Sequence, residues 1–249
     1  MEIEESIKLT RQGFEKSFKE EKFYNKQTTD DEHLNLIFEL INPVDGNVIL
    51  DLGTGSGYIA FPLAQQNSGI KVIGMDIVCD TIKRNTEKAI SKGIKNLSFI
   101  SYDGKTYPFE DNILDTITVR YALHHFPNII ESFHEMHRVL KAGGKLIISD
   151  PTPNANDSAG FVDKFMQMKP DGHIRFYSFT EYKNMLEEVG FKLFIQKDTS
   201  ISFPRKEPEK YKELLEMFQE DIISGYSIVV TDEEIWITEH VLNMVFIKE

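Results

Sequence analysis

The residues of this chain best suited to chemistry are the acid and the glycines of the segment Asp51–Gly57. Residues 47–50 before the segment predict a buried strand, and residues 58–61 after it predict the start of a helix. Glycines let the turn bend sharply and approach a bound ligand, and the first N–H groups of the helix point at the same spot. The Asp51 carboxylate repels a pyrophosphate and attracts a cation, so a ligand with an amino group and a sulfonium suits the segment. The alternative is a glycine-rich turn that binds nothing.

A second acid, Asp76, follows Gly57 by 19 residues and ends the next expected strand. In dinucleotide-binding folds, an acid about 20 residues beyond the glycines holds the ribose hydroxyls. Two hydroxyl donors on one carboxylate make a specific clamp, so we expect Asp76 to bind a ribose. The alternative is a solvated acid at a strand end.

Strands and helices alternate between the turn at residues 43–46 and residue 150, which predicts βαβ units with right-handed crossovers in a mostly parallel sheet. We expect strands at residues 48–52, 71–76, 97–101, 113–120 and 145–150. We expect helices at residues 58–66, at 79–92 with Gly93 as its stop, and from 129 to the glycine pair at 143–144.

Beyond residue 150 the pattern loosens. Residues 154–177 contain a short amphipathic stretch, which we expect either to cover a cleft or to be plain core. The capping-box sequence Ser178–Glu181 predicts a helix that ends at Gly190. Strands are expected at residues 191–197 and 241–248, around an insertion at about 199–240 with a helix and a hairpin. Residues 1–42 are expected to form a helical lid on a domain of residues 43–249.

Composition limits the partners of the protein. The formal net charge is −12 and no dense basic patch occurs, which disfavours nucleic acid as a partner. No apolar run has the length of a membrane span, and the acidic start is unlike a signal peptide, so we expect a cytoplasmic protein. The single cysteine, Cys79, excludes an internal disulfide framework and a multi-cysteine metal site. We expect a monomer or a homodimer.

Several sequence blocks recur in the order known from one enzyme family. They are Asp51–Gly57, Gly74–Asp76, Tyr102–Gly104, Tyr107–Asp115, Arg120–Phe126, Arg138–Gly144 and His173–Ser178. With these blocks, about residues 45–198 resemble the class I S-adenosylmethionine-dependent methyltransferases, most closely the small-molecule branch with the ubiquinone and menaquinone biosynthesis enzymes. The resemblance implies a Rossmann-like α/β fold with a seven-stranded, mostly parallel sheet, a C-terminal antiparallel strand and helices on both faces.

The resemblance also implies S-adenosylmethionine as cofactor and S-adenosylhomocysteine as product. The glycine-rich turn would lie under the methionine part, Asp103 would meet the adenine amine, and Tyr24 with the N-terminal helices would form the lid. Asp103 can equally be an ordinary turn residue. The expected cofactor-binding residues are Asp51, Gly53, Thr54, Gly55, Ser56, Gly57, Asp76, Ile77, Tyr102, Asp103, Gly104, Arg120, Ala122 and Tyr24.

Methyl transfer needs few catalytic groups from the protein, because a sulfonium is already activated and positioning of the reactants supplies much of the rate enhancement. A base matters only where the acceptor must lose a proton, and His124 and His125 are the candidates. Both can equally be structural histidines. The residues expected on the acceptor side are Asp150, His173, Arg175 and Tyr177, for which a solvated loop is an equal alternative. No metal site is expected, because His134 and His137 lack a third ligand nearby.

We therefore expect in-line methyl transfer to a small-molecule acceptor. A nicotinamide-dependent oxidoreductase is disfavoured, because the glycines run Gly-x-Gly-x-Gly and lack the dinucleotide spacing. A macromolecular methyltransferase is disfavoured by the charge and by the absence of an Asn-Pro-Pro-Tyr or Asp-Pro-Pro-Tyr tetrapeptide. A non-catalytic protein that binds S-adenosylmethionine stays open, because a cofactor site does not prove turnover.

Overall fold

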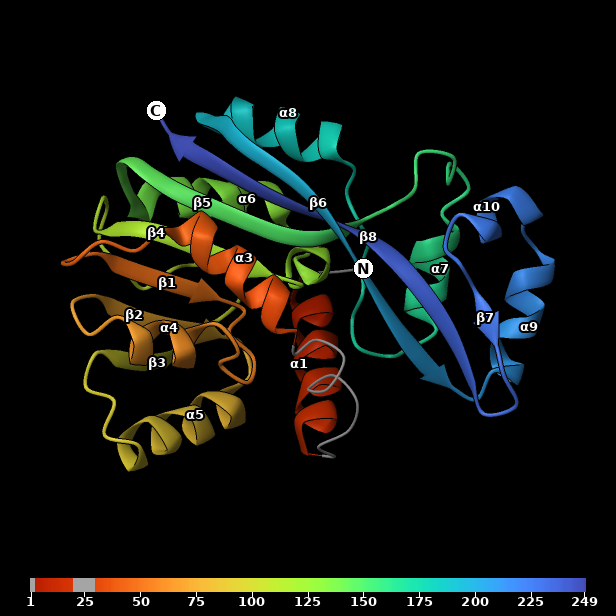
Figure 1. Ribbon diagram of the computed structural model, residues 1–249, viewed down its shortest axis with the longest axis horizontal. Coiled ribbons are helices and arrows are strands. Elements are labelled where there is room, and N and C mark those ends of the chain that lie inside the picture. The colour runs from red at the N-terminus through yellow and green to blue at the C-terminus, as the bar shows by residue number, and fades with distance from the viewer. Residues whose placement is uncertain (1–2, 20–29) are drawn as a thin grey trace.

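The computed structural model describes residues 3–19 and 30–249, in which helices lie against both faces of a twisted sheet (Figure 1). The strands are β1 (Val48–Leu52), β2 (Lys71–Asp76), β3 (Leu97–Ser101), β4 (Leu114–Arg120), β5 (Leu140–Thr152), β6 (Phe191–Lys206), β7 (Val229–Val230) and β8 (Glu234–Lys248). The helices are α1 (Ile3–Lys19), α3 (Asp31–Ile41), α4 (Ala60–Gln66), α5 (Cys79–Ser91), α6 (Ile129–Val139), α7 (Phe161–Gln167), α8 (Phe179–Val189), α9 (Glu209–Glu216) and α10 (Glu220–Ser224), with a short 3-10 turn at Leu123–His125.

The strand order is β3-β2-β1-β4-β5-β8-β6, and β7 pairs with the outer part of β8. The strands β1 to β5 are parallel to one another, and β8 runs antiparallel to both β5 and β6. Parallel strands end at one edge of a sheet, so the loops after β1, β2 and β4 meet there. The expected α/β fold with a C-terminal antiparallel strand is confirmed.

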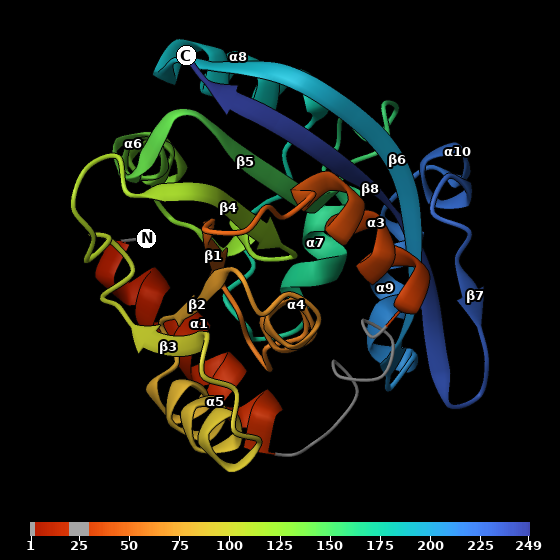
Figure 2. The same ribbon diagram turned by 60° about the vertical axis from the view of Figure 1, so that its left-hand side comes forward.

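The strands are buried on both faces because successive side chains point to opposite sides. Along β5, Leu146 and Ile148 join the cluster that packs under α6 and α8, whereas Ile147 joins the cluster under α3, α4 and α5. Figure 2 shows these two groups of helices on the two sides of the sheet. This packing holds the glycine-rich turn between β1 and α4 in a fixed place.

A third apolar cluster lies to one side of the parallel sheet (Figure 1). It is enclosed by α7, α9, α10, β7 and the outer parts of β6 (199–206) and β8 (234–240), which together we call the cap. Phe161 and Phe165 of α7 and Tyr226 are fully buried in it, and the Tyr226 hydroxyl donates to Asp157 Oδ2 at 2.7 Å. The cap is therefore a packed unit joined to the sheet by two long strands.

Three expected element bounds or counts differ from the structure. The strands expected at 191–197 and 241–248 extend to Lys206 and from Glu234, so much of the expected insertion is sheet. The sheet has eight strands, because Val229–Val230 also pairs with β8. The helix expected to close at 143–144 ends at Val139, and β5 begins at Leu140. The packing of the cap buries alternate residues in the outer parts of β6 and β8. Polar residues adjoin these buried residues, so the sequence did not indicate that the two strands continue there.

The N-terminal helix α1 passes the carboxyl ends of the parallel strands (Figure 1). It touches the loop before α8 with very little space: a Cβ on Gly13 would lie 2.5 Å from Asp171 Cα, and a Cβ on Gly172 would lie 2.3 Å from Thr10 Oγ1. Arg11 Nε also donates to the carbonyl of Ile77 at 3.0 Å. The division into a lid of residues 1–42 and a domain of residues 43–249 stays a prediction. Among the described residues, no helix combines the length and apolarity that crossing a bilayer requires.

Candidate active site

The turn after β1 has the backbone conformation that only glycine adopts readily. Gly53, Gly55 and Gly57 have φ angles of 68°, 49° and 77°. A Cβ on Gly53 would also lie only 2.8 Å from the Cβ of Ala122, so the loops after β1 and β4 are in close contact. Asn85 of α5 fixes the turn from behind, because its Nδ2 donates to the Gly55 carbonyl at 2.8 Å.

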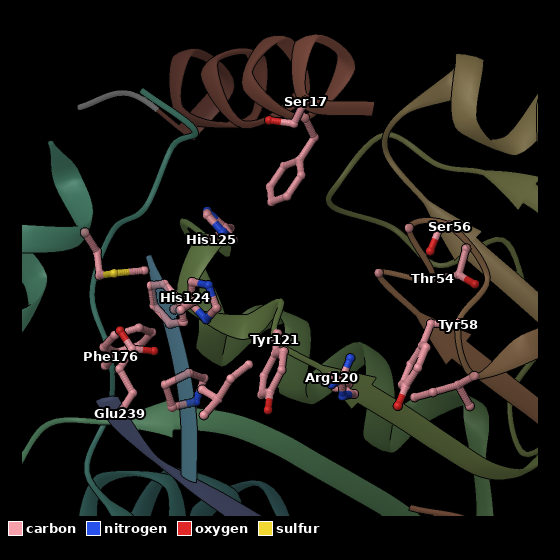
Figure 3. Close-up of a pocket in the computed structure, with 18 of the residues that line it drawn as sticks. Ser17, Thr54, Ser56, Tyr58, Arg120, Tyr121, His124, His125, Phe176 and Glu239 are labelled. Carbon is pink, nitrogen blue, oxygen red and sulfur yellow. The ribbon is translucent and has the colours of Figure 1, made fainter. Parts of the chain in front are cut away.

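Two adjoining cavities open on this turn. Cavity 1, of about 150 Å³, extends from the turn toward the cap, and cavity 2, of about 90 Å³, extends along the ends of β2 and β3. Phe14 of α1 lines both cavities, as do Tyr121 and His125. In Figure 3, Thr54 and Tyr58 lie on one side of cavity 1, and Phe176 and Glu239 lie on the opposite side. The site is thus an elongated space between the sheet edge, α1 and the cap.

Asp51 lies at the inner wall of cavity 1 with 3% of its surface exposed. Thr54 Oγ1 donates to its Oδ2 at 2.7 Å. Burial raises the pKa of the Asp51 carboxyl to about 7, and the hydrogen bond from Thr54 opposes this rise. A cation in cavity 1 would stabilise the ionised carboxylate in this water-poor setting.

Asp76 forms the corresponding acid of cavity 2. Its Oδ2 accepts from the Gly55 N–H at 2.9 Å and its Oδ1 from the Val78 N–H at 3.0 Å. Burial raises the pKa of this carboxyl, and these backbone donors oppose the shift. Ile77, Tyr102 and other apolar or small residues complete the wall. Each carboxylate oxygen retains a lone pair for a further donor, as hydrogen bonds from a diol would require.

Arg120 lies on the floor of cavity 1, between two aromatic rings. Its guanidinium carbon is 4.4 Å from the Tyr58 ring centroid and 4.1 Å from that of Tyr121. Its Nε donates to Nδ1 of His33 at 3.3 Å, and burial followed by the charge of Arg120 lowers the pKa of His33 to about 4. Tyr121 has a φ of 52°, which is uncommon for a bulky residue and here places its ring against the cavity.

His124 lines cavity 1 and belongs to a buried chain of polar groups. Its Nδ1 lies 3.0 Å from both oxygens of Asp150, and the Tyr182 hydroxyl donates to Asp150 Oδ2 at 3.0 Å. Burial lowers the pKa of His124, but the charge and the hydrogen bond of Asp150 raise it and the net shift is upward. Asp150, expected to touch the acceptor, is therefore bonded to the ring of His124 and does not line either cavity.

His125 lines both cavities but differs from its neighbour. Its Nδ1 has no hydrogen-bond partner, and burial lowers its pKa well below the usual value. Its ring packs edge-on against Phe14 with 5.0 Å between centroids. His125 is thus a neutral histidine that closes the site under α1.

The structure brings most of the expected cofactor residues to these cavities. Cavity 1 is lined by Asp51, Gly53, Thr54, Gly55, Ser56 and Arg120, and cavity 2 by Gly53, Gly55, Asp76, Ile77, Tyr102, Gly104 and Ala122. Gly57 lies outside both linings, and so does Asp103, whose Oδ1 accepts from two backbone N–H groups of its own turn. Tyr24 lies outside the described residues.

The remaining acceptor-side residues expected from the sequence do not line either cavity. His173 Nε2 pairs with Asp163 Oδ1 at 2.8 Å. Arg175 forms an ion pair with Glu181 of the capping box and lies over the Tyr177 ring. Instead, cavity 1 is completed by residues that we did not predict, namely Phe14, Ser17, Tyr58, Ile59, Tyr121, Pro151, Met166, Phe176, Ile201, Phe203, Arg205 and Glu239. Phe14 and Ser17 of this set belong to the expected N-terminal lid, and Met166 and Phe176 belong to the segment at 154–177 that we expected to cover a cleft or to be core.

The sequence model of the methyltransferase-domain family matches residues 43–219. The chain belongs to this family. The methyltransferase YcgJ of Bacillus subtilis, itself uncharacterised, is 30% identical over 141 residues, which cover 55% of this chain and 54% of that protein. The demethylmenaquinone methyltransferase of Thermus thermophilus is 30% identical over 114 residues, covering 46% of this chain and 51% of that protein. The matched part spans about half the length of these curated relatives.

Solved structures agree with the family assignment. A Bacillus halodurans C-125 protein assigned to the methyltransferases is 25% identical with a TM-score of 0.78, covering 87% of this chain and 99% of that chain. The [4+2]-cyclase SpnF, 18% identical with a TM-score of 0.64 over 91% of this chain and 85% of that chain, shares the fold alone. The resemblance to the S-adenosylmethionine-dependent methyltransferases is thus confirmed, and S-adenosylmethionine is the cofactor of this class.

The described residues fit that cofactor. Asp51 offers a buried carboxyl for an ammonium group, Asp76 offers lone pairs for ribose hydroxyls, and the apolar wall around Tyr102 and Ile77 suits an adenine ring. Gly53 and Gly55 line both cavities, and a Cβ on Gly53 would lie only 2.8 Å from the Cβ of Ala122, so the wall that the turn presents there is backbone.

Proposed function

We propose that this methyltransferase transfers a methyl group in line from S-adenosylmethionine to a small organic acceptor bound in the cap end of cavity 1. The observation that supports this most is the continuity of cavity 1 from the glycine-rich turn to Glu239 in the cap. Donor and acceptor would then share one enclosed space, covered by α1. Its limited volume favours a small molecule over a segment of protein or nucleic acid.

In this proposal, Asp51 holds the ammonium of the methionine part and Asp76 the ribose hydroxyls. S-adenosylmethionine supplies, when bound, a methyl group already activated by the sulfonium. The protein therefore contributes mainly positioning and the exclusion of water. Phe14 and Ser17 of α1 close the cavity from above, as Figure 3 illustrates for Ser17.

For an acceptor that must lose a proton, we propose His124 as the general base. Asp150 holds its Nδ1, so Nε2 is the nitrogen that remains to take the proton. Asp150 orients the ring and stabilises the imidazolium that forms, and Tyr182 in turn orients Asp150.

Calorimetry with S-adenosylmethionine and S-adenosylhomocysteine tests the cofactor assignment. We expect both to bind wild type, and Asp76→Ala to weaken binding at least about tenfold, because the ribose loses a charge-assisted pair. An exposed acid serves as matched control: Asp232→Ala should bind like wild type. Failure of both nucleotides to bind wild type would refute the assignment.

Turnover requires its own test, because SpnF shows that this fold also carries other activities. We expect a label in the methyl group of S-adenosylmethionine to move to compounds of a filtered small-molecule extract. His124→Gln should lower that rate by about 10²–10⁴-fold for an acceptor that loses a proton, with cofactor affinity unchanged. Binding without any transfer would support a non-catalytic role. Location in the cytoplasm and the monomeric or homodimeric state stay predictions from the sequence.

A further inference from the structure

The cap end of cavity 1 contains a buried arginine without an ion-pair partner. Arg205 is 8% exposed and lines cavity 1. Among residues 3–19 and 30–249, no carboxylate oxygen lies within 4.0 Å of its guanidinium nitrogens. Burying a charge is costly unless it is paired. The position of Arg205 therefore suits an anion, which no carboxylate of the described residues supplies within ion-pair distance.

The contacts that Arg205 does make leave much of its donor capacity unused. Nη2 lies 3.5 Å from Met166 Sδ, which is a weak acceptor, and the guanidinium lies over the Phe203 ring at 4.4 Å. The Tyr211 hydroxyl also interacts with it. Its buried Nε has no hydrogen-bond partner. A guanidinium has five N–H donors in a planar fork, which a carboxylate matches with two parallel hydrogen bonds.

Two buried acids, Asp171 and Glu239, interact electrostatically with Arg205, but neither forms an ion pair with it. Asp171 forms its ion pair with Lys169 Nζ at 3.0 Å. Glu239 is 1% exposed, also lines cavity 1, and its Oε1 has no hydrogen-bond partner. Burial raises the pKa of the Glu239 carboxyl to about 8, and the charge of Arg205 opposes this rise. Near neutral pH, Glu239 is therefore mainly uncharged and does not neutralise Arg205.

Strand register explains how these groups face one cavity. Ile201, Phe203 and Arg205 alternate along β6 and so share one face, and Glu239 of β8 is paired directly with Ile201. Arg205 is paired with Ile235, which places it farther out along the cap than Glu239. Figure 3 shows Glu239 beside Phe176 at the end of the cavity away from Thr54. The far end thus combines apolar walls with one charged and one polar group.

We propose that Arg205 binds a carboxylate of the methyl acceptor, so that the acceptor is an organic anion with an apolar body. The body lies against Phe176, Phe203 and Met166, and Glu239 forms a hydrogen bond to a polar atom nearer the reacting end. This inference deepens the proposed function and rests on it, since it assigns the same cavity to the acceptor.

Titration of two nearly isosteric probes tests the assignment. Phenylacetate and the neutral phenylacetamide are titrated by calorimetry into protein saturated with S-adenosylhomocysteine. We expect wild type to bind phenylacetate at least about tenfold more tightly than the amide. Arg205→Met, which keeps the length of the side chain, should lose this preference, and Arg205→Lys should keep part of it because the charge remains without the fork.

Arg175→Met is the matched control, because Arg175 is an exposed arginine paired with Glu181 outside both cavities and should leave the preference unchanged. Unchanged affinity for S-adenosylhomocysteine and unchanged thermal unfolding show that the Arg205 variants are folded. Equal binding of the two probes to wild type, binding of neither, or a preference that survives in Arg205→Met overturns the proposal. If wild type does not bind S-adenosylhomocysteine at all, the result would instead refute the proposed function.

Discussion

At the scale of single residues, the site depends on acids that are buried before any ligand arrives. Asp51 lies at the end of β1 with Thr54 as its hydrogen-bond donor. Burial raises its pKa to about 7, so ionisation of this carboxyl lowers the stability of the ligand-free protein, and a bound cation offsets that loss. Affinity for the cofactor and stability of the empty protein should therefore respond in opposite directions to one substitution.

Asp51→Asn is expected to weaken S-adenosylhomocysteine binding at least about tenfold at pH 8, because the ammonium loses its anion. The same change should raise the free energy of unfolding of the ligand-free protein by roughly 1–4 kcal/mol at pH 8. Calorimetry and denaturant unfolding measure the two effects. Asp232→Asn, an exposed acid, should change neither.

The pH dependence of Asp51 has a definite sign. In the unfolded chain the carboxyl ionises near its ordinary pKa of 3.8, and in the fold near 7. Its contribution to stability is therefore complete below the unfolded pKa and is lost as the pH rises through about 7. The stability gain of Asp51→Asn should accordingly be small at pH 4 and full at pH 8. A gain that does not vary with pH would contradict the assignment.

At the scale of elements, the helix α1 matters because it closes both cavities with Phe14. Its docking depends on the absence of a side chain at Gly13, where a Cβ would lie 2.5 Å from the Asp171 Cα. Backbone atoms at that distance must move. The contact between α1 and the loop before α8 therefore has no room for a larger residue at position 13.

Gly13→Ala tests this contact against helix propensity. Alanine should strengthen the helix by about 1 kcal/mol, but we expect the clash to outweigh this gain. Amide hydrogen exchange in residues 3–19 should accelerate, and S-adenosylhomocysteine should bind several-fold more weakly. Gln12→Ala, at an exposed position of the same helix, should slow exchange or leave it unchanged. A stabilised α1 in Gly13→Ala would show that the contact is loose.

At the scale of the whole molecule, the protein has two packed parts with the site between them. The parallel sheet provides the side of the site that we propose for the cofactor, and the cap provides the far end of cavity 1. Phe165 illustrates the separation, because it is fully buried in the cap, 4.5 Å from the Tyr211 ring centroid, and lines neither cavity.

Phe165→Ala should cost about 3–5 kcal/mol of unfolding free energy, since it leaves a void in the cap core. Hydrogen exchange should rise in the cap more than in β1 to β4, and the affinity for S-adenosylhomocysteine should change less than about twofold. The exposed Phe194 of β6 is the control, and Phe194→Ala should cost little. Equal loosening of the sheet and the cap would show that they unfold as one unit.

The sequence by itself determined the part of the site that we propose for the cofactor. The glycine-rich turn, Asp51 and Asp76 are close together in the chain and follow strands with a strong pattern, so their meeting at one sheet edge could be inferred from local signals. The same local signals placed His124 after β4. They did not reveal that Asp150 turns toward His124 and away from the cavity.

Only the tertiary structure decided the far end of the cavity. Arg205 and Glu239 are 34 residues apart and come together because β6 and β8 continue to pair beyond the parallel sheet. Nothing local distinguishes them from solvated charges of ordinary strands. Their burial comes from α7 and its neighbours, which pack on the outer strands. A charge removed from water in this way binds an opposite charge more strongly than a solvated charge does.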